Sequence, residues 1–181
     1  MPGAFAKNQQ KLEKRLREQE LAVLVWGSGR ASGEHYGSGR ASGEHYEKRQ
    51  KIRKALEEHF SKSEVRFSED LTHLVPSAGD VGIGQQEEYQ LALSDTCVVL
   101  DTSAGPAAEI AYFARNPLKH KLIVFTHDRH KGSESFPAQL REGLEHHFYS
   151  DAEYASCSLV ERICDRMRHV ALGKLLGVSP V

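Results

Sequence analysis

The chain alternates between short apolar runs and longer mixed segments whose apolar residues recur at helical spacing. Four runs predict buried strands, at residues 21–26, 65–67, 96–100 and 122–125. The segments between them have the three-to-four-residue apolar spacing of amphipathic helices. This order predicts an α/β fold, doubly wound in the flavodoxin or Rossmann manner, with a mostly parallel sheet of four to five strands and helices on both faces.

The helical segments can be placed from the same pattern. One predicted helix has an apolar face formed by Ile52, Ala55, Leu56 and Phe60, and a loop is expected at residues 76–84. Further helices are predicted at residues 85–93, 106–115, 137–147 and 152–176.

Three segments follow from these patterns. Residues 1–20 form a solvated N-terminal helix, in which charged residues surround the apolar pair Leu12 and Leu16. Residues 21–150 form the α/β domain. Residues 151–181 form a C-terminal helix that packs on this domain or on an oligomer interface.

A ten-residue sequence occurs twice in tandem, at 27–36 and 37–46. The period is too short for a repeat architecture, so the duplication adds residues between the first strand and the next helix. The turn after the strand must come from the first copy and the helix entry from the second. Whether the added chain loops out or extends the helix backward through residues 44–46 stays open.

Composition limits the classes of function. Lysine and arginine number 24 and aspartate and glutamate 25, which gives a net charge of -1 and no broad cationic surface for a nucleic-acid polymer. No apolar run is long enough for a membrane span or a signal core, so we expect a cytoplasmic protein. The three cysteines lack metal-ligand spacing, and we expect no metal or cofactor.

The candidate chemistry centres on Glu109. A short turn with Ser103, Gly105 and Pro106 leads from the third strand into the helix of Glu109. We expect Pro106 at the first helical position and Glu109 in the first turn, above the carboxyl end of the strand, where ligands bind in open α/β sheets. The helix dipole would keep Glu109 ionised. Two interpretations stay open: a stabilising charge at a helix start, or a nucleophile.

Further acidic groups are expected at the same edge. Glu87 and Glu88 begin the preceding helix, and Asp101 ends the third strand. Paired carboxylates suit cleavage of a glycosidic bond, whereas each alone is a common surface acid. His127 and its neighbours follow the fourth strand and could line this edge as well.

The turn after the first strand, Gly27-Ser28-Gly29-Arg30, has the composition of an anion-binding loop. The alternative interpretation of residues 27–30 is an ordinary glycine-rich turn with a solvated arginine. The glycine spacing does not match the dinucleotide fingerprint, which disfavours an oxidoreductase.

The segment from Gly105 to Tyr112 resembles the signature Gly-Thr-Ala-Ala-Glu-Ile-Gly-Tyr of the nucleoside 2-deoxyribosyltransferase family, and residues 94–101 resemble the strand before it. The Gly-Ser-x-Arg turn is similar to that of the related 2′-deoxynucleoside 5′-monophosphate N-hydrolases. TIR-type NAD hydrolases are more distantly similar. The resemblance extends over most of residues 21–126.

The resemblance implies roles for individual residues. Glu109 would be the nucleophile, and Glu87 would take the place of an aspartate that orients the base or the nucleophile. Ser28 and Arg30 would contact the phosphate or ribose. The remaining predicted catalytic residue is Asp101, and the remaining predicted substrate contacts are Gly27, Gly29, Ser103 and Gly105.

We therefore expect cleavage or transfer of an N-glycosidic bond on a nucleoside, a nucleotide or a nucleotide-like cofactor. The partner is a small molecule, and the family's assembly implies a homo-oligomer. The alternatives are a non-catalytic nucleotide sensor and an NAD-cleaving enzyme.

Overall fold

The computed structural model describes residues 3–27, 41–71, 73–74, 81–102, 104–132 and 143–178. Its centre is a five-stranded sheet in which every neighbouring pair of strands is parallel. The strands are β1 (Ala22–Trp26), β2 (Glu64–Arg66), β3 (Thr96–Asp101), β4 (Leu122–His127) and β5 (Glu145–Tyr149). The predicted doubly wound α/β class is confirmed.

The strand order is β2-β1-β3-β4-β5, the flavodoxin-like order. The two connections that leave β1 and β3 run to opposite faces, so the order reverses between these strands. Both are almost entirely buried, as are the first five residues of β4, which explains their unbroken apolar sequences. In sheets of this kind, ligands bind at the carboxyl ends of the two strands between which the order reverses, here β1 and β3.

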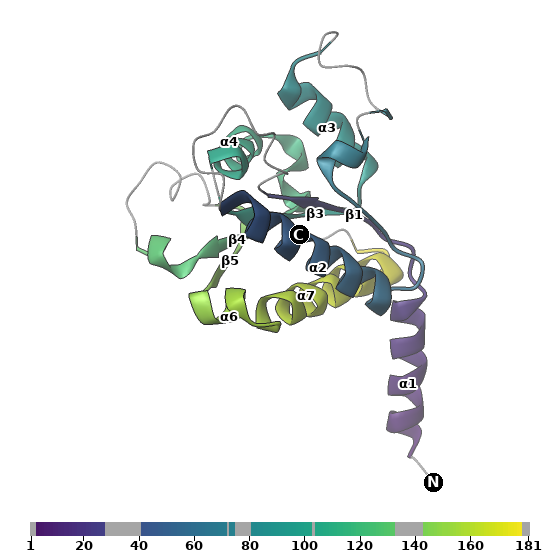
Figure 1. The fold of residues 1–181 in the computed structure, drawn as a ribbon. Coiled ribbons are helices and arrows are strands. Elements are labelled where there is room, and N and C mark those ends of the chain that lie inside the picture. The colour runs from purple at the N-terminus through teal and green to yellow at the C-terminus, as the bar shows by residue number, and fades with distance from the viewer. Residues whose placement is uncertain are drawn as a thin grey trace.

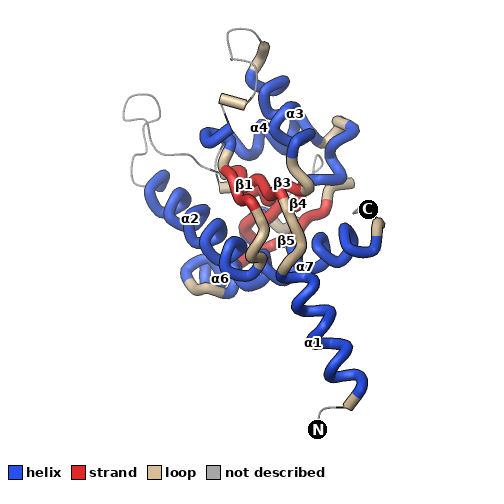
Figure 2. The backbone as a smooth tube through the Cα atoms, turned by 90° about the vertical axis from the view of Figure 1, so that its right-hand side faces the viewer, coloured by secondary structure: helices blue, strands red, loops and turns tan. Residues whose placement is uncertain are grey.

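Helices cover both faces of the sheet (Figures 1 and 2). On one face lie α2 (Ala41–His59), α6 (Asp151–Ala155) and α7 (Ser158–Leu176), and on the other lie α3 (Ile83–Leu93) and α4 (Ala104–Phe113). Each face has its own apolar cluster. Alternate residues of the same strand enter different clusters: Val25 packs toward α2 and α7, and Trp26 packs toward α4.

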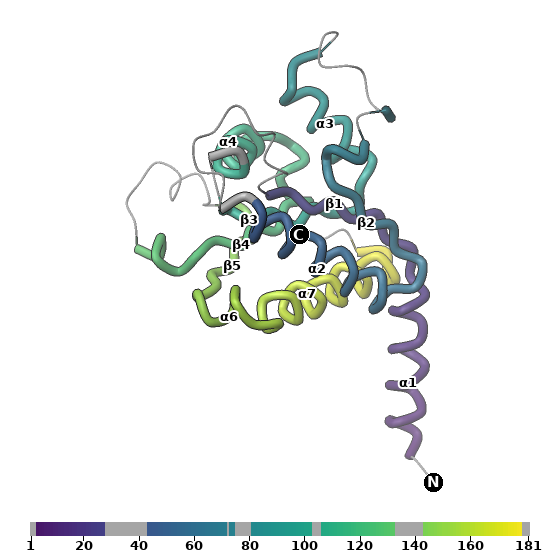
Figure 3. The backbone as a smooth tube through the Cα atoms, viewed as in Figure 1, coloured from purple at the N-terminus to yellow at the C-terminus, as the bar shows by residue number. Residues whose placement is uncertain are grey.

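The N-terminal helix α1 (Ala4–Arg17) projects from the domain (Figures 1 and 3). Its attachment is near its C-terminal end, where Leu16 is buried in the core and Glu13 pairs with Arg168 of α7. Phe5, near its other end, is almost fully exposed. The predicted solvated helix is therefore present, and one of its two leucines anchors it.

The duplicated segment contributes to α2, which begins at Ala41, inside the second copy. The expectation that the second copy builds the helix entry is confirmed, and this copy extends the helix backward beyond residue 44. The rest of the duplicated segment, residues 28–40, lies outside the described residues.

The predicted helix over residues 137–147 is wrong at its end, because Glu145, His146 and His147 lie in the edge strand β5. The segment is polar since only Tyr149 is buried there. Its side chains have specific partners: Glu145 pairs with Arg166 of α7, and the His147 ring stacks on Phe125 of β4. An edge strand whose polar side chains are paired in this way does not need the apolar run that marks the inner strands.

The predicted helix over 152–176 is interrupted at residues 156–157, which separates α6 from α7. The buried ammonium group of Lys48 in α2 donates hydrogen bonds to the carbonyl oxygens of Tyr154 and Ser156. These bonds satisfy acceptors that the end of α6 leaves without a helical partner. In the described part of the chain, no helix has the length and apolar character needed to cross a membrane.

Candidate functional site

The candidate site lies at the carboxyl edge of the sheet, near the ends of β1 and β3. Helices α3 and α4 and the short helix η1 (Ser68–Leu71), which follows β2, surround this edge. Four charged side chains from four different elements act on one another here: Arg49, Glu69, Glu87 and Glu109. This is the position at which open α/β sheets bind ligands.

Glu109 differs from expectation in its place along the helix. Helix α4 begins at Ala104, so Pro106 is its third residue and Gly105 lies inside the helix. Proline is tolerated there because the first-turn N–H groups have no partner within the helix. No acidic residue lies in the first turn, and Glu109 belongs to the second. The prediction of a first-turn carboxylate is wrong.

This displacement changes the charge state of Glu109. The Oε2 atom of Glu109 is buried and makes no hydrogen bond with any described residue. Burial first, and the negative charge of Glu87 second, raise the pKa of Glu109 to about 8, against the opposing influence of Arg49. The expectation that the helix dipole keeps the group ionised is therefore wrong, because a pKa of about 8 favours the protonated form at neutral pH.

Glu87, on α3, is the predicted acidic residue that the structure brings close to Glu109. Its negative charge raises the pKa of Glu109, and burial raises its own pKa. Cys97 of β3 lies near both, fully buried, and has the character expected of a core thiol. Two carboxyl groups in one low-dielectric region cannot both ionise easily, so one keeps its proton.

Arg49 is the site residue that the sequence interpretation missed. Its side chain is 2% exposed, and it forms a 3.0 Å ion pair with Glu69 and donates a 3.1 Å hydrogen bond to the Val25 carbonyl oxygen. Its guanidinium lies over the Phe67 ring. A signal was present: Arg49 is three residues before Ile52, on the apolar face of its helix, where a charge requires a partner.

Gly27 follows β1 and borders Arg49. A Cβ atom on Gly27 would come within 3.1 Å of the Arg49 Cδ atom and 3.4 Å of the Leu100 Cβ atom. The absence of a side chain therefore leaves room for the buried arginine. The other predicted contacts Ser28, Gly29, Arg30 and Ser103 lie outside the described residues, so their binding roles stay predictions.

Asp101 lies at the end of β3 but toward β4 and β5. It accepts a 3.1 Å hydrogen bond from the Thr126 hydroxyl, and burial first and the Asp101 charge second raise the pKa of Tyr149 in β5. Among the described residues, the charges that act on Glu109 are those of Glu87, Arg49 and Glu69. The structure thus brings Glu87 to Glu109 and places Asp101 in a different environment.

Glu88 and His127, which were also expected at this edge, make contacts that connect neighbouring elements of the fold. Glu88 accepts hydrogen bonds from Tyr112 and Asn116, which connects α3 to the end of α4. His127 accepts a hydrogen bond from the Arg129 backbone and lies 2.8 Å from a carboxylate oxygen of Asp151. Within the described ranges, no group of three histidine, cysteine or acidic residues is placed to hold a metal ion.

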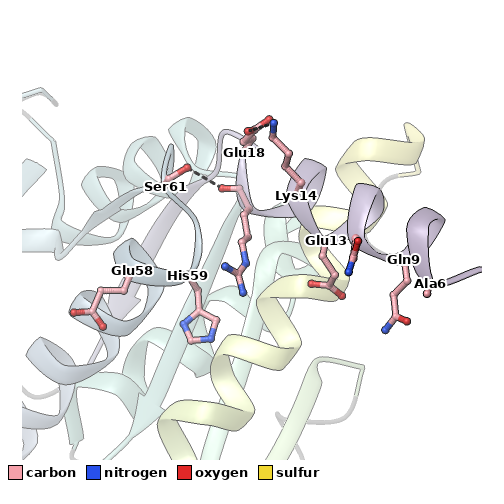
Figure 4. Close-up of a pocket in the computed structure, with 10 residues that line it drawn as sticks. Ala6, Gln9, Glu13, Lys14, Glu18, Glu58, His59 and Ser61 are labelled. Carbon is pink, nitrogen blue, oxygen red and sulfur yellow. Dashed lines mark hydrogen bonds and ion pairs between the residues drawn. The ribbon is translucent and has the colours of Figure 1, made fainter. Parts of the chain in front are cut away.

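A polar groove elsewhere on the molecule contains none of these groups. It lies between α1 and the end of α2 and is lined by side chains that include Glu13, Lys14 and His59 (Figure 4). Helix α2 runs antiparallel to the strands, so this groove is at the amino edge of the sheet. The perturbed carboxyl groups, not this groove, mark the candidate site.

A comparison with protein families matches residues 45–142 to the STM3845 retron effector protein family, which is more than half of the 181-residue chain. The chain belongs to this family. The matched segment includes Arg49, Glu69, Glu87 and Glu109, the four charged residues of the site. A comparison with curated proteins gave no match.

The buried ion pair can be tested with two arginines of the same helix. Arg49 and Arg53 both lie over the Phe67 ring and pair with acids of η1, but their side chains are 2% and 26% exposed. We expect Arg49→Met to lower the free energy of unfolding by about 2–3 kcal/mol and Arg53→Met by less than about 1 kcal/mol, measured by urea unfolding. Equal losses would contradict the role of burial.

The protonated state of Glu109 predicts a pH-dependent stability. Because its pKa is higher in the folded chain, the folded state holds a proton that the unfolded state has released above its ordinary pKa of 4.5. Relative to Glu109→Gln, the wild-type protein should lose stability as the pH rises from about 5 to 8, by at most about 1.4 kcal/mol per pH unit.

The measurement is urea unfolding of both proteins at a series of pH values. Glu58→Gln, which alters an exposed carboxylate of α2, is the control. Parallel stability curves for wild type and Glu109→Gln over this range would show that Glu109 is not held protonated.

Proposed function

We propose that this chain is a retron effector, with a role in defence against phage, that cleaves or transfers an N-glycosidic bond of a nucleoside, a nucleotide or a nucleotide-like cofactor. Membership of the STM3845 family supports the effector role. The observation that carries the chemistry is the buried, unbonded Glu109 carboxyl oxygen at the sheet crossover, beside the charge of Glu87.

In the proposed reaction, a carboxylate oxygen of Glu109 bonds to C1′ of the sugar. The C1′–N bond breaks, and its electron pair leaves with the base, which takes up a proton in every case except nicotinamide, whose ring nitrogen is positively charged before the bond breaks. Water, or a second base, then displaces the carboxylate from C1′. Hydrolysis gives the free sugar, and transfer gives a new nucleoside.

Because its raised pKa favours the protonated form, Glu109 itself can supply the proton that the departing base takes up. Glu109 must release a proton before it attacks, and the departing base must gain one. Passage of this proton to the base, directly or through Glu87, would create the nucleophile and activate the leaving group together. Glu87 would orient this exchange, and Arg49 would favour the ionised form of Glu109.

The same pKa favours one alternative, a nucleotide sensor without catalysis. A carboxyl group that stays protonated when ligand binds can donate a hydrogen bond but cannot attack C1′. The two proposals differ in the fate of the bound molecule, which is either cleaved or released intact.

The test is chromatographic detection of free base, or of nicotinamide, after incubation with nucleosides, nucleotides, their 2′-deoxy forms and NAD. We expect release that falls at least about 1,000-fold in Glu109→Gln and stays unchanged in Glu58→Gln. Above pH 8 the rate should fall about tenfold per pH unit, because the protonated fraction of Glu109, which supplies the proton to the base, falls. Tight binding without release would support the sensor, and neither binding nor release would reject both.

A further inference from the structure

Glu69 is a charged residue of the candidate site to which the proposed reaction gives no role. It lies in η1, which follows β2 at the carboxyl edge of the sheet. Its side chain is 48% exposed, whereas the side chain of its ion-pair partner Arg49 is 2% exposed. The charge of Glu69 can therefore be removed with little disturbance of the core around Arg49.

The Arg49 guanidinium is held by three contacts. Its Nη2 atom donates a 3.0 Å hydrogen bond to a Glu69 carboxylate oxygen and a 3.1 Å hydrogen bond to the Val25 carbonyl oxygen. Its Cζ atom lies 4.1 Å from the centre of the Phe67 ring. Of these three partners, only Glu69 has a full negative charge. Glu69 thus compensates the buried positive charge and fixes the direction in which Arg49 points.

Arg49 borders the strand that leads into the helix of Glu109. A Cβ atom on Gly27 would lie 3.1 Å from the Arg49 Cδ atom and 3.4 Å from the Leu100 Cβ atom. The stem of Arg49 therefore lies at the carboxyl ends of β1 and β3. Since α4 is the element after β3, the guanidinium is held on the side of the sheet edge that Glu109 occupies.

The other partner of the ion pair, Glu69, is connected to the helix of Glu87. The Gln90 Nε2 atom of α3 donates a 3.1 Å hydrogen bond to the carbonyl oxygen of Ser68, the residue before Glu69. Gln90 lies about one helical turn after Glu87. This bond ties η1 to α3, so the Arg49–Glu69 pair is fixed to both helices that carry the acids of the site.

The described groups that interact with Glu109 come from four elements. They are Glu87 of α3, Arg49 of α2, Glu69 of η1 and Cys97 of β3. Burial raises the pKa of the Cys97 thiol well above its ordinary value, so this group is neutral at neutral pH. Burial has the largest effect on the pKa of Glu109 and raises it, the two acids raise it further, and Arg49 lowers it. Any change in the charge that compensates Arg49 should therefore alter the proton affinity of Glu109.

We propose that Glu69 is a positioning residue for Glu109: it holds the Arg49 guanidinium in their ion pair, and the charge of Arg49, once compensated, leaves Glu109 with its proton. The inference rests on the proposed function, in which this proton passes to the departing base. Glu69 acts through Arg49 and not on the substrate. Neutralising Glu69 should make Glu109 release its proton at lower pH, because the charge of Arg49 is then unmatched.

Carbon-13 NMR titration of the ligand-free protein tests this without a substrate. The Glu109 carboxyl signal is assigned by its loss in Glu109→Gln. We expect its midpoint to be at least about 0.5 pH unit lower in Glu69→Gln than in the wild-type protein. Glutamine keeps the side-chain length and an oxygen that accepts a hydrogen bond from Arg49, so the variant isolates the charge. An unchanged midpoint would overturn the inference.

Asp70 offers a matched control. It follows Glu69 in η1 and forms a 3.0 Å ion pair with Arg53, whose guanidinium also lies over the Phe67 ring. Among the described residues, Asp70 is not one of those whose charge acts on Glu109. We therefore expect Asp70→Asn to leave the Glu109 midpoint unchanged. A shift as large as that of Glu69→Gln would indicate a general effect of lost negative charge and would overturn the specific role.

A second substitution shows whether Glu69 acts through Arg49. In Arg49→Met, the further change Glu69→Gln should shift the Glu109 midpoint by less than half of its effect in the wild-type background. A full shift without the arginine would show that Glu69 acts on Glu109 directly, and would overturn the positioning role. Urea unfolding identifies the conditions in which the Arg49→Met proteins are folded. Glu69→Gln and Asp70→Asn keep Arg49, so they test the inference even if these proteins do not fold.

The rate of base release separates this inference from the proposed function. If the wild-type protein releases base, the pH above which the rate falls should decrease in Glu69→Gln by as much as the NMR midpoint. Base release with an unmoved pH profile would keep the glycosidase and reject the inference. A shifted midpoint without base release by the wild-type protein would reject the glycosidase and keep the effect of Glu69 on Glu109.

Discussion

A buried cation must be matched by acceptors and by an opposite charge, and the Arg49 side chain meets this constraint by contacting three parts of the fold. It extends from α2 to the Val25 carbonyl oxygen, the Glu69 carboxylate and the Phe67 ring. It thereby fixes the carboxyl ends of β1 and β2 relative to α2. Its positive charge also acts on Glu109, so the same group supports the scaffold and tunes the site.

The sequence was sufficient to predict the inner part of the fold. Strands β1, β3 and β4 are buried on both faces and therefore read as apolar runs. The edge strand β5 was missed because it is polar, and its partners, such as Arg166 for Glu145, are distant in the chain. The break between α6 and α7 depends on Lys48, more than a hundred residues away in the sequence. Interactions of this kind leave no local pattern.

The candidate site was predictable in position and less so in chemistry. The turn after β3 directed attention to Glu109, and Glu87 is near it as expected. The predicted charge state of Glu109 was wrong because the pKa of this group depends on burial and on the approach of α3. Neither can be inferred from the position of a residue near the start of a helix. Asp101 shares the sheet edge with Glu109 but faces β4 and β5, and the separation of these two environments is set by strand order.

These features give the family match a chemical interpretation. The residues matched to the STM3845 retron effector family include the whole charged cluster, whereas the duplicated segment lies mostly before the match. The proposed chemistry therefore lies in the part of the chain that follows the duplication. Its centre is a carboxyl group whose pKa is raised to about 8 by burial and by a second acid.

The most direct test of that claim is a carbon-13 NMR titration of the glutamate side-chain carboxyl groups in the ligand-free protein. The account predicts one carboxyl signal that titrates near pH 8, disappears in Glu109→Gln and moves to lower pH in Glu87→Gln. If every glutamate titrates near its ordinary pKa of about 4.5, Glu109 is ionised at rest and the central claim is contradicted.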